Sequence, residues 1–275
     1  MARLLASRLT EKRGWTTVVE NRAGAGGAIG AALVANSPPD GYSLLVVSTS
    51  HTMIGAIQKL PYDPVKSFTP IAIIGTGPNV ITIRSALPVN SIAELIAYAK
   101  ERPGKLTYAS AGVGSNPHFV GELFKLAANI DVLHVPYKGG SPAINDLLAG
   151  QVDIYWGGLA TVLPLIKAGK MKALGVSTRE RSQAAPEIPI IADTLPGFEA
   201  SIWYAVLAAP NVPAAIVAKL NTEITSVMRD PETVKQVEAA GVDATTSSSA
   251  AAAKVIADNA TKWMAIAKSA NIRME

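Results

Sequence analysis

Apolar runs typical of strands alternate with apolar runs typical of helices along most of this chain. The strand-type runs are short and continuous, whereas the helix-type runs are longer and repeat their apolar residues at three- and four-residue spacing. The predicted strands are 16–20, 42–47, 71–74, 80–83, 105–108, 132–136, 152–156, 171–176 and 201–209. The predicted helices are 1–12, 28–35, 91–100, 119–128, 142–148, 162–167, 213–228, 231–240 and 250–269. Strands that alternate with helices indicate βα units and largely parallel sheets, so we predict an α/β fold.

Small polar turns follow several of the predicted strands. They lie at 21–27, 48–52, 109–118, 137–141 and 156–161 and are rich in Gly, Ser, Thr or Asn. Because parallel sheets bind ligands at the carboxyl ends of their strands, these turns predict a ligand cleft between two α/β lobes. We expect one lobe to contain residues 1–84 and 201–275, and the other to contain residues 85–200.

The turn at 109–118 has the sequence Ala-Ser-Ala-Gly-Val-Gly-Ser-Asn-Pro-His and connects a predicted strand to a predicted helix. A glycine-rich turn at a helix N-terminus exposes backbone N–H groups, and the helix dipole there favours negative charge. Ser110 and Ser115 add hydroxyl groups, and His118 adds a ring N–H in the first helical turn. This pattern predicts a binding site for a small anion such as a carboxylate.

Composition excludes several other classes of site. The chain has 275 residues, 49% of them hydrophobic, and it has no cysteine. Disulfides, zinc–thiolate sites and cysteine nucleophiles are therefore excluded. Lys and Arg are scattered and the net charge is only +4, which argues against a nucleic-acid partner. The histidines do not have the spacing of a metal site, and no metal or cofactor is expected.

Some residues allow more than one interpretation. Residues 24–30 carry glycines between a predicted strand and a predicted helix, as in a dinucleotide fingerprint, but their spacing is displaced by one position. Ser110, His118 and Asp153 could form a hydrolase triad, although no Gly-x-Ser-x-Gly elbow is present. His118 is either a ligand contact or a helix cap, and Lys138 is either a partner for a carboxylate or a solvated side chain.

Several stretches together resemble one known family, the periplasmic solute receptors of tripartite tricarboxylate transport systems, also called Bug-type receptors. The matching stretches are 18–27, 35–42, 60–64, 109–118, 134–139 and 166–170. The resemblance implies a two-lobed type II periplasmic-binding-protein fold with a hinge and a ligand cleft between the lobes. It also implies a periplasmic receptor, expected to be monomeric, that closes around a small organic carboxylate and delivers it to the membrane subunits of the transporter. A ligand-sensing module of the same fold is the alternative function, and an enzyme is not expected.

The resemblance also implies which residues contact the ligand. The matched loop contributes Ser110, Ala111, Gly112, Gly114, Ser115 and His118. Looser matches in the neighbouring turns add Ser48, Thr49, His51, Tyr137, Lys138, Trp156 and Gly157. Trp156 stands where the family usually carries an acidic residue, and its indole is expected to offer a stacking face to flat or aromatic acids.

The first residues of the sequence differ from the family pattern. The family opens with a strand and a Pro-Phe-x-x-Gly-Gly loop before its first helix, whereas residues 1–12 here already have the pattern of that helix. Charged residues interrupt this segment, so it does not resemble a signal peptide. Loss of a central strand is expected to expose apolar surface and to open a sheet edge.

Overall fold

The computed structural model describes residues 1–22 and 27–273, and these fall into two compact units. Unit 1 contains Met1–Thr76 and Trp203–Ala265, and unit 2 contains Gly77–Ile202 and the residues from Ile266 onward. Part of the possible dinucleotide fingerprint, residues 24–26, lies outside the described residues. Within the described residues, no helix has the length and apolar character needed to cross a membrane.

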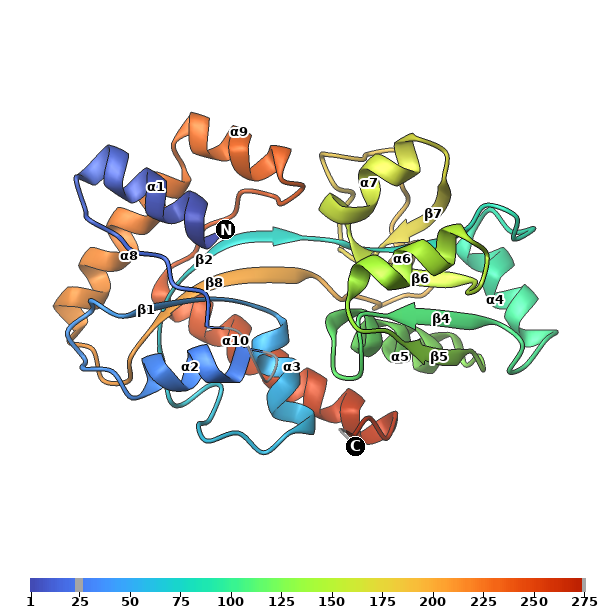
Figure 1. The fold of residues 1–275 in the computed structure, drawn as a ribbon, viewed down its shortest axis with the longest axis horizontal. Coiled ribbons are helices and arrows are strands. Elements are labelled where there is room, and N and C mark those ends of the chain that lie inside the picture. The colour runs from blue at the N-terminus through green and yellow to red at the C-terminus, as the bar shows by residue number, and fades with distance from the viewer. Residues whose placement is uncertain (23–26, 274–275) are drawn as a thin grey trace. The chain divides into compact units, whose positions relative to one another are not determined.

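Unit 1 is built on a sheet with the strand order β1–β8–β2. The strands are β1 (Leu44–Ser48), β2 (Thr69–Gly77) and β8 (Ile202–Ala208), and β1 runs antiparallel to β8 (Figure 1). The helices are α1 (Ala2–Arg13), α2 (Ala28–Ala35), α3 (Ser50–Ile57), α8 (Ala214–Met228), α9 (Pro231–Ala239) and most of α10 (Ser249–Ser269).

Helices cover both faces of the unit 1 sheet, as the alternation of its side chains shows. Leu44 and Val46 of β1 pack into one apolar cluster with Leu5 and Leu9 of α1. The intervening residues of β1 pack into a second cluster that contains Ala31 of α2. Because successive side chains of a strand point to opposite faces, α1 and α2 lie on opposite faces of the sheet.

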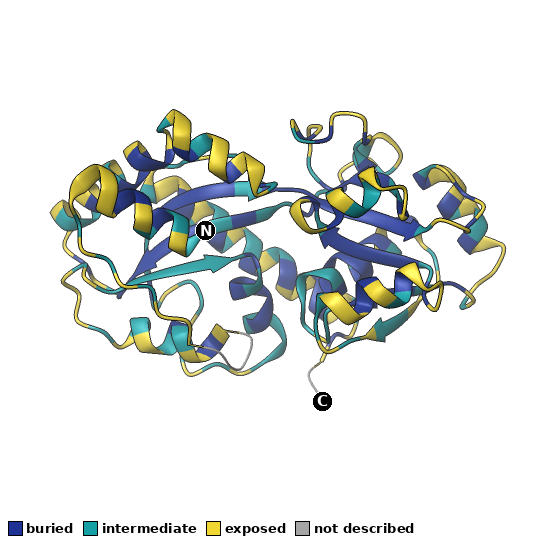
Figure 2. Ribbon diagram, turned by 45° about the horizontal axis from the view of Figure 1, so that its top comes forward, coloured by how far each residue is buried: buried dark blue, intermediate teal, exposed yellow. Residues whose placement is uncertain are grey.

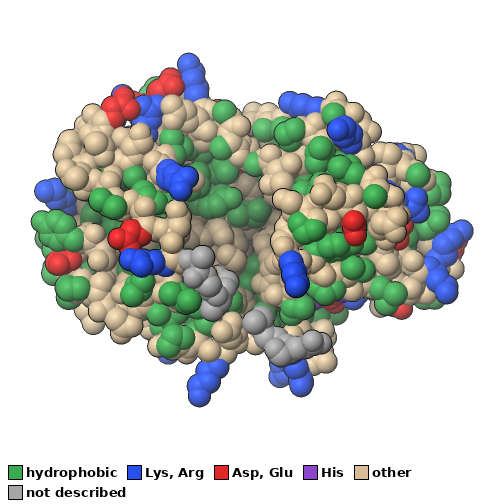
Figure 3. Space-filling view, viewed as in Figure 1, with side chains coloured by type: hydrophobic (Ala, Val, Ile, Leu, Met, Phe, Trp, Pro, Cys, Tyr) green, Lys and Arg blue, Asp and Glu red, His purple; other side chains and the backbone are tan. Residues whose placement is uncertain are grey.

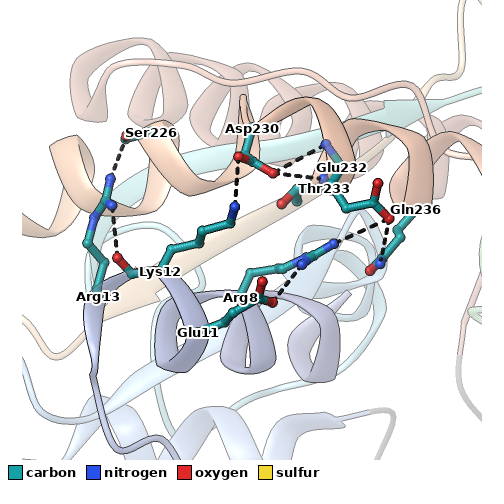
Figure 4. Close-up of polar contacts among 9 residues, drawn as sticks. All are labelled: Arg8, Glu11, Lys12, Arg13, Ser226, Asp230, Glu232, Thr233 and Gln236. Carbon is teal, nitrogen blue, oxygen red and sulfur yellow. Dashed lines mark hydrogen bonds and ion pairs between the residues drawn. The ribbon is translucent and has the colours of Figure 1, made fainter.

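Charged side chains connect α1 to α8 and α9 (Figure 4). The buried Arg8 contacts Glu11 at 2.6 Å and Glu232 at 3.7 Å, and Lys12 pairs with Asp230 at 3.2 Å. Residues 1–12 therefore form the amphipathic helix that the sequence predicted, with its apolar side in the core of unit 1.

Unit 2 is built on a sheet with the strand order β5–β4–β6–β3–β7. Its strands are β3 (Asn79–Arg84), β4 (Thr107–Ser110), β5 (Leu133–Pro136), β6 (Ile154–Gly158) and β7 (Met171–Val176). Its helices are α4 (Ile92–Lys100), α5 (Asn116–Ala128), α6 (Gly140–Leu148), α7 (Leu159–Lys167) and the 3₁₀ helix η2 (Ile191–Asp193). One apolar cluster of this unit lies between the sheet and α6 and α7.

The structure confirms most of the predicted elements and corrects several details. The sheets are mixed rather than largely parallel: β4 is parallel to β5 and β6, but β3 is antiparallel to β6 and β7. Helix crossovers make neighbouring strands parallel, and β3 follows β2 without such a crossover. Since β3 pairs within the sheet of unit 2, residues 77–84 belong to that unit and not to the first lobe as predicted.

The predicted buried strand at 16–20 is wrong. Residues 14–22 contain no strand, and the Val18 side chain is 82% exposed. No described residue pairs its backbone with 16–22, so no ladder defines a strand there. The sequence analysis also did not predict α3, which begins at Ser50 within the small polar turn predicted at 48–52.

Candidate functional site

The loop between β4 and α5 has the geometry expected for an anion site within unit 2. β4 ends at Ser110, and α5 begins at Asn116 with a proline in its first turn. Gly112 has φ 124° and Gly114 has φ 78°, a region of backbone conformation that side chains disfavour. The backbone N–H groups of Val113 and His118 make no hydrogen bond to a described residue. The loop therefore presents donors at the positive end of the α5 dipole.

The two serine hydroxyls of this loop hold the loop together rather than face outward. Ser110 is fully buried, and its Oγ lies 2.7 Å from Nε2 of His134 and 3.1 Å from the backbone of Gly112. The Ser115 hydroxyl donates to the Gly112 carbonyl at 2.6 Å. The sequence predicted both hydroxyls as ligand contacts, but the structure assigns them to the shape of the loop. Backbone donors remain as the groups available to an anion.

A stack of three aromatic rings, those of His118, His134 and Tyr108, packs beside the loop. Nδ1 of His118 accepts a hydrogen bond from the Gly114 N–H at 3.1 Å, and the ring stacks on that of His134 at 3.9 Å. The His134 ring stacks in turn on Tyr108 at 4.8 Å. Nδ1 of His118 therefore ties the loop to the first turn of α5, while its Nε2 makes no hydrogen bond to a described residue.

The sequence analysis missed a partly buried ion pair next to this stack. The Tyr108 hydroxyl donates to Glu122 at 2.7 Å, and Lys125 pairs with the same carboxylate at 2.8 Å. Burial raises the pKa of Tyr108, and the neighbouring Glu122 charge adds to the effect. The four-residue spacing of His118 and Glu122 places both on one face of α5, which is the signal that could have indicated this arrangement.

The stacked histidines make the stability of unit 2 depend on pH. Burial, with the nearby His118 and Lys125, lowers the pKa of His134 from 6.5 to about 3, and burial also lowers the pKa of His118. Below pH 6.5 the unfolded chain therefore binds more protons at these rings than the folded protein does. We expect the free energy of unfolding to fall as the pH decreases from 7 to 5, as measured by urea denaturation.

A double variant isolates this effect. His118→Gln with His134→Gln is expected to have a flatter pH profile than the original protein between pH 7 and 5. His51→Gln is the comparison for unit 1, where burial also lowers the pKa of His51, and it is expected to flatten the profile less because it removes one such ring rather than two. An unchanged slope in the double variant would contradict the assignment.

The loop that follows β5, at residues 137–139, is hydrogen-bonded to the loop between β4 and α5. The Tyr137 N–H donates to the Ser110 carbonyl at 3.1 Å, and the Gly139 N–H donates to the Ala111 carbonyl at 3.2 Å. The Tyr137 hydroxyl donates to Asp146 at 2.6 Å, and burial with this contact raises the pKa of Tyr137 to about 12. Lys138 is exposed and pairs with no described acidic residue. The bond from Gly139 places the backbone after Lys138 next to residues 111–115, which we call the anion loop.

Trp156 and Gly157 are buried in the core of unit 2. The Trp156 side chain is 1% exposed and packs against Phe124 at 5.4 Å and Phe198 at 6.1 Å between ring centroids. A Cβ on Gly157 would come within 2.8 Å of both Tyr155 and Val162. The expectation of an open stacking face on Trp156 is therefore wrong, because protein side chains already surround the indole.

The residues of the turn at 48–52 that were predicted to contact the ligand lie in unit 1. The Ser48 hydroxyl is 3.0 Å from that of Ser50, and the buried Thr49 hydroxyl accepts from the Trp203 N–H at 2.9 Å. His51 is also buried: its Nε2 donates to the Pro64 carbonyl at 2.9 Å, and its ring packs against Phe68. Only Ser48 and Ser50 keep partly exposed hydroxyls, at the N-terminus of α3.

The possible hydrolase triad is not assembled. Asp153 accepts hydrogen bonds from Arg84 at 2.8 Å and from the Thr107 N–H at 2.9 Å, and it makes no contact with His118. Ser110 bonds His134 instead, and this hydroxyl is inaccessible to a substrate because Ser110 is fully buried. The loop can hold an anion, but these three residues cannot relay a proton to a nucleophile.

The two units, each with a mixed sheet, have the fold of the periplasmic-binding proteins. Solved structures of such proteins match this chain over nearly its whole length. An R. palustris protein with adipate is 33% identical with a TM-score of 0.86, over 99% of this chain and 92% of that chain. The MatC protein from Rhodopseudomonas palustris with bound malate is 29% identical with a TM-score of 0.81, over 96% and 92% of the two chains.

The family follows from the sequence comparison. The model of the tripartite tricarboxylate transporter family receptor matches residues 1–272. Protein BugT of Bordetella pertussis is 33% identical over 279 residues, which cover all of this chain and 86% of BugT. The chain therefore belongs to the tripartite tricarboxylate transporter family of receptors, as the sequence motifs predicted, and members of this family are periplasmic solute-binding proteins.

Proposed function

We propose that this protein is a periplasmic receptor that binds a small organic carboxylate at the loop between β4 and α5. The observation that carries this proposal is the pair of backbone N–H groups, at Val113 and His118, that make no hydrogen bond to a described residue. The exposed Lys138 lies in the loop that is hydrogen-bonded to theirs. Backbone donors at a helix N-terminus hold a carboxylate without a buried arginine, which permits release of the ligand. Basic side chains elsewhere are scattered over the face seen in Figure 3, which suits a small anion better than a polyanion.

The relatives narrow the class of ligand. Adipate and malate, which two of the solved relatives hold, are both dicarboxylates. We therefore favour an aliphatic dicarboxylate as the ligand, with aromatic acids and acidic amino acids as further candidates. The receptor then delivers this ligand, as a monomer, to the membrane subunits of a tripartite transporter. Closure about a hinge stays a prediction from the family resemblance.

A thermal-shift titration tests the ligand class. We expect adipate or malate to raise the melting temperature, because a ligand at 100 times its Kd stabilises the fold by about 2.7 kcal/mol. Adipamide, which has the same length but no charge, is the control and is expected to have no effect. Equal shifts with the acid and the amide, or no shift with any dicarboxylate, aromatic acid or acidic amino acid, would overturn the proposal.

Lys138→Gln is expected to weaken dicarboxylate binding about tenfold, because a charge-assisted hydrogen bond contributes about 1.5–3 kcal/mol. Isothermal titration at low salt measures the change in Kd. Lys170→Gln is the matched control, since Lys170 is also exposed but lies in the turn before β7. If both variants lose the same affinity, the effect is long-range charge and Lys138 makes no contact with the ligand.

A further inference from the structure

The N-terminus of α6 lies next to the anion loop within unit 2. The Gly139 N–H donates to the Ala111 carbonyl at 3.2 Å, and α6 begins at the next residue, Gly140. The N–H groups of Gly140 and Ser141 make no hydrogen bond to a described residue. These two groups are therefore donors at the positive end of a second helix dipole.

A buried tyrosine brings its hydroxyl group to this end of α6. Tyr155 lies on β6, an inner strand of the unit 2 sheet that is buried along 154–157 (Figure 2). Its ring belongs to the apolar cluster between the sheet and α6 and α7. A Cβ on Gly140 would lie 3.0 Å from the Tyr155 hydroxyl oxygen. Glycine at position 140 therefore leaves room for the hydroxyl group beside the first turn of α6.

The Tyr155 hydroxyl group has no partner within the described protein. Tyr155 is only 4% exposed, yet its hydroxyl makes no hydrogen bond to a described residue. The oxygen is not completely enclosed by protein atoms, so an atom from outside the protein can reach it. Since a buried tyrosine hydroxyl normally has a hydrogen-bond partner, the partner of this one must come from a bound molecule.

All the groups that meet here are donors to an anion. Burial raises the pKa of Tyr155, so its phenol stays protonated at neutral pH and donates a hydrogen bond without carrying a charge. The Ser141 hydroxyl is exposed and makes no hydrogen bond to a described residue. The acidic residue of α6, Asp146, is already bonded to the Tyr137 hydroxyl. Several converging donors at a positive helix end favour a carboxylate over a neutral group.

We propose that Tyr155, together with the N–H groups of Gly140 and Ser141, binds the second carboxylate of an aliphatic dicarboxylate. This inference rests on the proposed function, in which the anion loop binds the first carboxylate. The bond from Gly139 to Ala111 joins the two helix N-termini, so one short ligand reaches both. Tyr155 then selects dicarboxylates, because a ligand with a single carboxylate leaves its buried hydroxyl without a partner.

Tyr155→Phe tests the proposal, because it removes the hydroxyl group and keeps the ring in the core. Adipate is compared with hexanoate, in which a methyl group replaces one carboxylate. We expect Tyr155→Phe to raise the Kd of adipate about tenfold and to change the Kd of hexanoate by less than about twofold, as measured by isothermal titration. Tyr98→Phe is the matched control, because Tyr98 also lies in unit 2 but on α4, and it should change neither Kd.

Amide chemical shifts of the unsubstituted protein give a second test that needs no variant. We expect adipate to shift the amide signals of Val113, His118, Gly140 and Ser141. Hexanoate should shift the signals of Val113 and His118 alone, because it occupies only the anion loop. Equal shifts of Gly140 and Ser141 with both acids would contradict a separate site for the second carboxylate.

The titrations separate this inference from the proposed function. The inference is overturned if Tyr155→Phe weakens both acids equally or weakens neither of them. If the unsubstituted protein binds adipate and hexanoate with the same Kd, only the inference fails, since the protein is still a carboxylate receptor. If it binds neither acid, the inference also fails, and the thermal-shift series with the other acids decides the proposed function separately.

Discussion

Replacing Trp156 by alanine should lower the free energy of unfolding by about 3–5 kcal/mol, the usual range for a buried aromatic side chain. The indole is 1% exposed and touches Phe124 and Phe198, so its removal leaves a cavity between two rings that cannot close easily. Urea denaturation followed by circular dichroism measures the loss. Trp156→Phe keeps part of the contact and should have a smaller effect.

An exposed aromatic residue provides the control for this measurement. Tyr42 is 91% exposed, and Tyr42→Ala should change stability by less than about 0.5 kcal/mol. A small loss for Trp156→Ala would show that the indole is not packed as described. The packing also predicts that Trp156→Ala has the same effect on the Kd of aromatic and aliphatic acids. A selective loss of aromatic acids would restore the stacking role that the sequence suggested.

Gly121→Ala should destabilise the protein by about 1–3 kcal/mol, although alanine is the better helix former. Gly121 lies inside α5, and a Cβ there would meet Tyr108 atoms at 2.4 and 2.8 Å. Tyr108 cannot move away, because its ring stacks on His134 and its hydroxyl is bonded to Glu122. Since these rings support the anion loop, dicarboxylate affinity should also decrease in the same variant.

Two comparisons separate the steric effect from helix propensity. Gly30→Ala in α2 meets only ordinary contacts at 3.6 Å and should be neutral or stabilising by up to about 1 kcal/mol. In a Tyr108→Ala background, Gly121→Ala should lose most of its cost, which a double-mutant cycle measures. Equal effects at Gly30 and Gly121 would contradict the close approach of α5 to Tyr108.

The order of helices and strands could be predicted from the sequence because it depends on local patterns. The run from 105 to 128 illustrates this: a short apolar segment, a glycine-rich turn and a longer periodic segment became β4, the anion loop and α5. The positive φ angles of Gly112 and Gly114 agree with the choice of glycine at those turn positions. The place of the loop therefore needed no tertiary information, although the structure shortens the predicted turn at 109–118 to residues 111–115.

The direction of the side chains in that loop could not be predicted in the same way. Ser110 turns inward because His134, which is 24 residues away in the chain, lies beside it on the neighbouring strand β5. Trp156 looked available because it ends a predicted strand, but Phe198 packs against it from a distant loop. Residues 16–20 have the pattern of a strand, yet a strand requires a ladder partner that no described residue supplies.

The amino-acid sequence by itself therefore determined the α/β class and the position of the glycine-rich loop, because apolar periodicity and glycine placement act over a few residues. Its motifs, by their resemblance to known receptors, identified the family. Only the tertiary structure decided that the Ser110 and Ser115 hydroxyls are hydrogen-bonded within the protein, whereas the Val113 and His118 N–H groups make no hydrogen bond to a described residue. It also decided that residues 16–20 have no backbone ladder partner among the described residues. Both outcomes depend on which distant segments pack together, since a hydrogen-bonding group is free only when no neighbour in space has used it.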